Sequence, residues 1–270
     1  MGELRESALS SCAFIRSISL SDEITEIGEK AFFNCRKLES VVIPNSVTKI
    51  GPCAFAWSGL KSITLLDGRL TEIGNSAFFN CENLESVVIP KTVTKIGPGA
   101  FESSGLKSIT LLDGRLTEIG EKAFYYCCNL ETVVIPKTVT KINPEAFAYS
   151  GLKSITLLDG LTEIGEKSFY SCRILETVVI PNSVTKIGPK AFALNGLKSI
   201  ILPDGLIEIG RGAFHSCRNL ETIVIPDSVT KIDPYAFACS GLKLITLPDG
   251  VEIGENAFYE CHNLVVKYRN

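Results

Sequence analysis

Hydrophobic residues recur in this chain at fixed positions, in a unit that repeats about every 23 residues. In one such unit, Leu38, Val41 and Ile43 follow the spacing L-x-x-V-x-I, with polar or outward positions between them. The alternation of Val41 and Ile43 predicts a short strand with one buried face, and the proline that follows lacks a backbone donor and ends the strand. An Ala-Phe pair marks each unit: Ala31-Phe32, Ala54-Phe55, Ala77-Phe78, Ala100-Phe101, Ala123-Phe124, Ala146-Phe147, Ala191-Phe192, Ala213-Phe214, Ala236-Phe237 and Ala257-Phe258, with Ser168-Phe169 as a variant.

A fixed period of this length predicts a solenoid, in which each coil stacks only on its neighbours. We therefore expect one domain over residues 1–270. Its predicted fold is an α/β solenoid: a right-handed superhelix of about twelve coils, with a parallel sheet on one face and short helices or 3-10 turns on the other.

The predicted helices rest on the residues around each bend. One position per coil, from Gly28 to Gly254, admits only Gly, Asn or Asp, which predicts a tight bend with a left-handed backbone. Proline, as at Pro52, or glutamate then stands where the first residue of a helix is expected. Gly59 and its equivalents in alternate coils stand where a helix C-cap is expected. Each coil is therefore predicted to run as strand, bend, short helix and return.

Two kinds of coil alternate, so the full repeat is 46 residues long. One kind contains L-E-S/T-V-V-I-P and a cysteine, and the other contains G-L-K-S-I-T-L and a serine. The residue after the strand leucine consequently alternates between Lys or Arg and Glu, from Arg16 to Lys243. This alternation predicts an unbroken ladder of opposite charges, and a second ladder runs from Glu26 to Glu252. Such exposed pairs contribute only about 0.2–1 kcal/mol each, and they leave the face nearly neutral, which disfavours a charged ligand.

The complete pattern, L-x-x-V-x-I-P-x-x-V-T-x-I-G-x-x-A-F-x-x-C-x-x-L, resembles the BspA-like leucine-rich repeat family, the 23-residue repeat class, over essentially the whole chain. The resemblance implies a non-enzymatic protein-binding or adhesion module of a bacterial-type protein, located at the cell surface or secreted. Its implied partner is a host or neighbouring-cell surface protein. The alternative is a structural or engineered repeat scaffold without an evolved ligand, which the near-identical repeats favour. The N-terminal residues show no signal-peptide hydrophobic region, so a cytoplasmic location also stays open.

Bulk composition excludes several partner classes. The net charge is −3, so the chain lacks the basic footprint of a nucleic-acid-binding protein. No apolar run approaches the roughly 18 residues of a transmembrane helix, so we expect no membrane insertion. Neither end of the chain shows a distinct polar cap, which predicts either a segment of a longer array or end-to-end self-association.

The ten cysteines follow the repeat rather than a metal-binding or disulfide pattern. Seven fall three residues after the Phe or its equivalent, and most of these lie two coils apart, roughly 10 Å on strand spacing, beyond the Cα separation of about 7 Å that a disulfide allows. Cys12 and Cys35 are one coil apart and are the ladder pair that could bridge. The remaining cysteines of this ladder are expected to be buried free thiols. With only His215 and His262 present, we expect no metal, no cofactor and no catalytic residues.

Two surfaces are candidate protein contacts. Aromatic residues beside the core Phe either pack over neighbouring alanines or form an exposed contact stripe: Phe33, Trp57, Phe79, Tyr125, Tyr126, Tyr149, Tyr170, His215 and Tyr259. The outward positions of the strands form a small, mildly apolar face: Val42, Thr64, Val88, Thr110, Val134, Thr156, Val179 and Ile201. Solenoids commonly bind through such a face, but this one lacks the Trp, Tyr and Arg anchors of strong interfaces.

Overall fold

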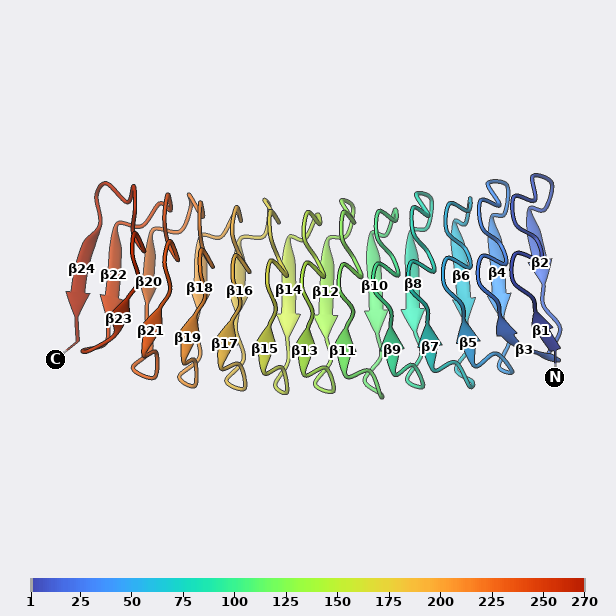
Figure 1. The fold of residues 1–270 in the computed structure, drawn as a ribbon, viewed down its shortest axis with the longest axis horizontal. Helices are drawn as coiled ribbons and strands as arrows, with labels where there is room; N and C mark the ends of the chain where they lie inside the picture. The colour runs from blue at the N-terminus through green and yellow to red at the C-terminus, as the bar shows by residue number, and fades with distance from the viewer. Residues whose placement is uncertain (1, 270) are drawn as a thin grey trace.

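Parallel strands stack side by side along the length of the molecule in the computed structural model, which describes residues 2–269 (Figure 1). The odd-numbered strands form one 12-stranded sheet, the first sheet: β1 (Gly2–Leu4), β3 (Ile24–Ile27), β5 (Lys49–Ile50), β7 (Glu72–Ile73), β9 (Lys95–Ile96), β11 (Glu118–Ile119), β13 (Lys141–Ile142), β15 (Glu163–Ile164), β17 (Lys186–Ile187), β19 (Glu208–Ile209), β21 (Lys231–Ile232) and β23 (Glu252–Ile253).

The even-numbered strands form the second face, divided into a nine-stranded and a three-stranded sheet. The nine strands are β2 (Ser17–Ser19), β4 (Ser40–Ile43), β6 (Ser62–Leu65), β8 (Ser86–Ile89), β10 (Ser108–Leu111), β12 (Thr132–Ile135), β14 (Ser154–Leu157), β16 (Thr177–Val179) and β18 (Ser199–Ile201). The three are β20 (Thr222–Val224), β22 (Leu244–Leu247) and β24 (Val265–Tyr268). The chain is thus a parallel-strand solenoid of about twelve coils, as the repeat predicts.

The predicted short helices are wrong: no residue between 2 and 269 is helical, and each coil has a run of turns instead. Hydrogen bonding explains the difference. The Tyr125 amide donates to the Lys122 carbonyl within its own coil (3.0 Å), whereas the Phe124 amide donates to the Ala146 carbonyl of the next coil (2.8 Å). A helix requires every amide to donate four residues back along the chain. Alternate amides of this segment therefore donate to the next coil of the solenoid. Because those amides are not available for bonds within the segment, it cannot form a helix.

The left-handed backbone lies within these turns and not at the predicted bend. Lys122 and Tyr126 have φ angles of +54° and +57°. Each is the third residue of a four-residue turn, 120–123 or 124–127, and a type II turn requires a positive φ at that residue. The bend glycines, such as Gly120, do not have positive φ. They allow close contact, because a Cβ at Gly120 would lie 2.4 Å from the Ile96 carbonyl oxygen of the preceding coil, although Asn143 and Asp233 occupy the same position in two other coils.

The glycines predicted to be helix C-caps are likewise explained by close backbone contact and not by a left-handed backbone. Gly151 has an ordinary φ, but a Cβ there would lie 2.0 Å from the Cys128 carbonyl oxygen. Gly59 and Gly105 make equally close approaches to the coil before them. Both sets of glycines, at the bend and at the predicted C-cap position, therefore permit close contact between the backbones of neighbouring coils.

A stack of phenylalanine rings forms the centre of the core. The rings run from Phe32 to Phe258, with neighbouring centroids 4.9–5.8 Å apart and nearly parallel planes. All but the last are fully buried. Since each ring contacts the next, the core continues without a break through the coils that carry them.

The cysteine ladder runs beside this stack, and all ten cysteines are free in the structure. The Cys127 thiol donates to the Phe101 carbonyl (3.1 Å) and lies 3.4 Å from the Ser104 hydroxyl. Burial raises the pKa of Cys127 to about 12, as it does for Cys81, Cys172 and Cys217. These thiols are buried and free, as predicted; in addition they are protonated and donate hydrogen bonds between coils, which was not predicted.

The pair that could form a disulfide does not do so in the structure. Cys12 is half-buried and Cys35 is buried, and both are free. The Cys35 thiol instead donates to the Leu9 carbonyl of the preceding coil at 3.0 Å. This is the same carbonyl contact that the other buried thiols make.

The predicted unbroken charge ladder on the second face is wrong, because it is divided into one group of three, Arg16, Glu39 and Lys61, and separate pairs after it. Lys107 binds Glu85 at 2.9 Å, and Lys153 binds Glu131 at 2.8 Å, but within residues 2–269 no ion pair joins Lys107 to Glu131. Strand register accounts for this. Strands β8 and β10 align over four residues, whereas β10 and β12 align only at Ser108. Each 46-residue repeat thus contributes two second-face strands that align with each other over more residues than with the strands of the next repeat.

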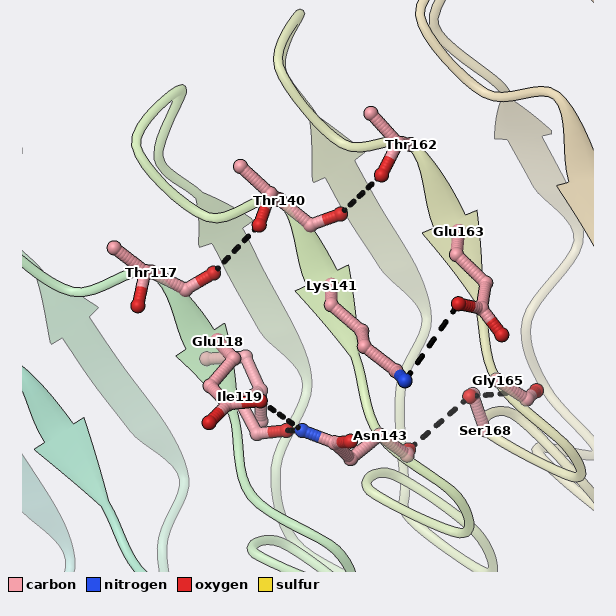
Figure 2. A network of polar contacts seen from close by, with 10 residues as sticks. All are labelled: Thr117, Glu118, Ile119, Thr140, Lys141, Asn143, Thr162, Glu163, Gly165 and Ser168. Atoms are coloured by element: carbon pink, nitrogen blue, oxygen red, sulfur yellow. Dashed lines mark hydrogen bonds and ion pairs between the residues drawn. The ribbon is translucent and has the colours of Figure 1, made fainter.

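The charge ladder of the first sheet is interrupted as well: Glu72 binds Lys49 and Lys95, but within residues 2–269 no ion pair joins Glu118 to the lysine on either side. Glu and Lys alternate in register along it, and Lys141 lies 3.6 Å from Glu163 (Figure 2). Beside these charges runs a threonine ladder, in which the Thr140 hydroxyl donates to the Thr117 carbonyl at 3.2 Å (Figure 2). That carbonyl also accepts the Thr140 amide at 2.8 Å. Five threonines contribute two hydrogen bonds each between coils in this way: Thr48, Thr71, Thr94, Thr140 and Thr162.

Within residues 2–269, the structure holds no helix that is long and apolar enough to span a bilayer.

Candidate protein-binding surfaces

Four tyrosines from three successive coils meet on the turn side of the molecule. Tyr126 and Tyr149 stack with ring centroids 4.8 Å apart and planes 17° from parallel. Tyr125 meets the edge of Tyr149 at 5.5 Å, and Tyr170 meets it at 5.4 Å from the next coil. We call these four residues the tyrosine cluster. Burial raises the pKa of Tyr125 and of Tyr149, so their hydroxyls are uncharged at neutral pH.

The backbone places two of these side chains at a strained position. Tyr126 and Tyr149 both have left-handed φ angles, +57° and +58°. A bulky residue there is a steric outlier, whereas asparagine adopts this conformation readily. Other coils place Asn34 and Asn80 at the equivalent position. The equivalent residue of the other coils is left-handed as well, for example Ser103 at +56° and Leu194 at +59°, so the conformation belongs to the turn of the repeat.

An apolar groove adjoins the cluster. It has a volume of about 370 Å³ and is lined by Tyr126, Cys128, Tyr149, Ser150, Gly151, Ser171, Arg173 and Ile174. Tyr126 is 46% exposed and Ile174 is 49% exposed. The Arg173 guanidinium donates to the Ser171 hydroxyl at 3.3 Å at the margin of this groove. The arrangement combines exposed apolar surface with a positioned cation, which is typical of a protein contact.

Ile174 was not among the predicted contact residues, although its position in the repeat carries a signal. The equivalent position is Lys37, Asn83, Asn129 or Asn219 in the other coils of this kind. Among these coils, the isoleucine at a position otherwise occupied by lysine or asparagine is the substitution that creates the apolar wall; the first coil has Phe14 there.

The other predicted aromatic residues do not join the cluster. Trp57 is exposed and meets the edge of half-buried Phe79 at 5.7 Å, beside a smaller groove of about 200 Å³. Phe33 is half-buried, and Tyr259 is exposed on the last coil. His215 is half-buried, and burial lowers its pKa. The nine residues therefore divide into a cluster, a pair and three separate positions.

The eight predicted strand-face residues all point outward and are exposed. Neighbours such as Val134 and Thr156 lie in register on adjacent strands. Val224 adds an exposed apolar side chain beyond Ile201. This face is continuous but shallow and carries no aromatic residue, so the tyrosine cluster is the stronger candidate contact.

Comparison with known proteins agrees with this architecture. Residues 2–127, 117–238 and 163–267 match the family described as "BspA type Leucine rich repeat region (6 copies)". No curated protein sequence matches the chain.

Several solved structures are similar to the chain along most of its length. A leucine-rich repeat protein from Bacteroides ovatus is 28% identical, with a TM-score of 0.61, over 98% of this chain and 86% of that one. A leucine rich cell surface protein from Faecalibacterium prausnitzii is 29% identical, with a TM-score of 0.54, over 99% and 83%. The pneumococcal vaccine antigen PcpA is 23% identical, with a TM-score of 0.55, over 97% and 74%, and supports the fold alone. With the family match covering nearly every coil, this protein belongs to the BspA type leucine-rich repeat family.

Proposed function

We propose that this protein is a non-enzymatic binding module of a bacterial-type cell-surface protein, and that it contacts a protein on a host or neighbouring cell. Family membership and the similarity to a leucine rich cell surface protein support the surface location. Repeat scaffolds of this kind act by presenting surfaces rather than by catalysis.

The observation that carries the proposal is the stacking of half-buried Tyr149 on exposed Tyr126 at the margin of an apolar groove. Two stacked tyrosines occupy a left-handed position that asparagine fills more easily, and they stand beside the exposed Ile174. Tyr, Trp and Arg dominate binding energy at protein interfaces, especially around a small apolar centre. The cluster and Arg173 supply these residue types together, whereas the strand face supplies none of them.

We expect the double variant Tyr126→Asn, Tyr149→Asn to bind cells at least about 100-fold more weakly while remaining folded, because interface anchors contribute about 2 kcal/mol or more each. Asn34 and Asn80 show that the backbone accepts asparagine at this position. The measurement is saturation binding of the fluorescent chain to intact epithelial cells and to neighbouring bacteria, followed by flow cytometry.

The matched control is Val134→Ser, Val179→Ser, which changes the exposed strand face and should leave binding unchanged. Circular dichroism of both variants checks the fold. Equal binding by the tyrosine variant would contradict the assignment of the surface. Absence of saturable binding by the wild-type chain would contradict the function and would favour a scaffold without an evolved ligand.

A further inference from the structure

A second groove lies on the turn side, two 46-residue repeats before the groove beside the tyrosine cluster. It has a volume of about 200 Å³ and is lined by Trp57, by Gly59 and by the polar side chains of Arg36, Asn80, Glu82 and Asn83. Trp57 occupies the position in its coil that Tyr149 occupies in the later one, and Gly59 matches Gly151. The same backbone framework therefore forms both grooves, and their side chains make them different.

Polar residues replace the apolar wall of the later groove. Asn83 stands where that groove has Ile174, and Glu82 stands where it has Arg173. Arg36 lines the earlier groove from the preceding coil, so this groove carries one cation and one anion, whereas the later one carries a cation alone. Because a charged ligand would be attracted by one group and repelled by the other, the balanced pair favours an uncharged ligand.

The two charged side chains are held apart, each by an asparagine two residues before it. Arg36 Nε donates to Asn34 Oδ1 at 2.8 Å, and Asn80 Nδ2 donates to Glu82 Oε1 at 2.9 Å. Among residues 2–269, no ion pair joins Arg36 to Glu82, although both line the groove. The terminal N–H groups of the guanidinium are therefore free to donate, and the second carboxylate oxygen is free to accept.

Trp57 lies in the coil between the coils that carry these two charges, and it supplies an aromatic surface. Its side chain is 41% exposed, and the Phe79 ring of the next coil meets it at 5.7 Å with planes 66° apart. Gly59 has no side chain to fill the groove beside the indole. The exposed Asn83 carboxamide, which makes no hydrogen bond within the described part of the chain, adds one donor group and one acceptor.

We propose that this groove binds a neutral sugar ring, a pyranose unit of an oligosaccharide. One face of a pyranose carries C–H groups that pack on an aromatic ring, and its hydroxyls both donate and accept hydrogen bonds. Arg36 donates to these hydroxyls and Glu82 accepts from them, so both charges find partners in one uncharged ligand. An aromatic wall with a few converging polar groups is typical of such sites. This site is separate from the proposed protein contact and does not rest on it.

The test uses the fluorescence of Trp57, which is the single tryptophan of the sequence and therefore reports on this groove. The chain is titrated, up to about 10 mM ligand, with neutral oligosaccharides in two arms: fragments of glucan, mannan, galactan and xylan, and uncharged glycans released from glycoproteins. We expect saturable binding with a Kd of about 1 mM in at least one arm, as suits a shallow site that holds one ring. That arm identifies the source of the sugar.

A sulfated oligosaccharide is the charged comparison, and it should bind no more tightly than the neutral sugar. The proposal is overturned if no neutral sugar changes the fluorescence, or if the sulfated one alone does so.

The variants Arg36→Ala and Glu82→Ala change exposed side chains and keep the tryptophan, so both should stay folded and can be titrated in the same way. We expect each to bind the sugar at least about 10-fold more weakly, because each loses hydrogen bonds to a charged group. The matched control is Arg218→Ala, which removes an exposed arginine at the equivalent position of another coil and should bind as the wild type does. Unchanged affinity in both groove variants would rule out this site.

Calorimetry extends the test to Trp57→Ser, a change that the repeat accepts because Ser103 occupies the equivalent position with a similar φ. Its sugar binding should also be at least about 10-fold weaker, since the aromatic surface is lost. Equal binding would contradict the role of the indole. The variant Tyr126→Asn, Tyr149→Asn leaves this groove intact and should bind the sugar normally, so failure of the sugar site and failure of the protein contact are distinguishable.

Discussion

Replacing Phe124 by alanine is expected to lower the free energy of unfolding by about 3–5 kcal/mol, the range for a fully buried phenylalanine. The ring is fully buried and stacks between Phe101 at 5.5 Å and Phe147 at 5.1 Å. The backbones above and below are held by hydrogen bonds between coils, so the cavity cannot collapse easily. In a one-dimensional stack the loss also weakens the coupling between the coils on either side.

Urea unfolding followed by circular dichroism measures this loss. We expect a lower midpoint and a broader transition, because the two halves become less cooperative. The matched control is Phe258→Ala, at the end of the stack, where the ring is half-buried and contacts one neighbouring ring. That variant should lose less than half as much stability. An equal loss in the two variants would contradict a core whose centre is supported from both sides.

The second large effect is expected for Gly105→Ala, which should cost about 3 kcal/mol, at the upper end of typical overpacking. A Cβ at this position would lie 1.9 Å from the Glu82 carbonyl oxygen and 2.7 Å from its carbon. Both atoms belong to the backbone, so no side chain can move aside. The coils would have to separate, which would weaken the hydrogen bond from the Gly105 amide to the Cys81 carbonyl, 3.0 Å long.

The matched control is Gly205→Ala, since a Cβ there meets only the Asn182 carbonyl oxygen, at 3.1 Å. Neither glycine has a positive φ, so the comparison isolates close approach from backbone conformation. Thermal unfolding of the two variants should differ by several degrees. Similar melting temperatures would show that the coils can separate without cost.

The strands and the core could be predicted from the sequence because they depend on the repeat alone. The spacing of Leu38, Val41 and Ile43 defines a buried strand face, and the Ala-Phe pair defines the ring stack. The turns could not be predicted in the same way, because the Phe124 amide has its partner 22 residues away in the next coil. A signal was nevertheless present: Gly99 and Ser103 occupy two left-handed positions four residues apart, and bulky residues such as Tyr126 obscure the pattern in other coils.

The glycine columns show a second limit of sequence reasoning. A position at which glycine recurs can reflect either a left-handed backbone or close backbone contact, and Gly120 and Gly105 belong to the second class. The presence of glycine at a position does not by itself distinguish a left-handed backbone from close backbone contact.

The tyrosines of the candidate site could be named from the sequence, but the groove beside them could not. Tyr126 and Tyr149 occupy the same position in successive coils, 23 residues apart, so their stacking follows from the repeat. The groove beside them depends on Ile174, which stands out only when its column is compared between coils.

Native-state hydrogen exchange tests most directly the claim that the coils form one stack joined by hydrogen bonds on the turn side as well as in the sheets. The account predicts that the amides of Phe124 and Tyr126, which donate to the next coil, exchange as slowly as those of β12 and β14. Protection should fall only towards the first and last coils. Fast exchange throughout the turn side, or two internal blocks with unequal protection, would contradict it.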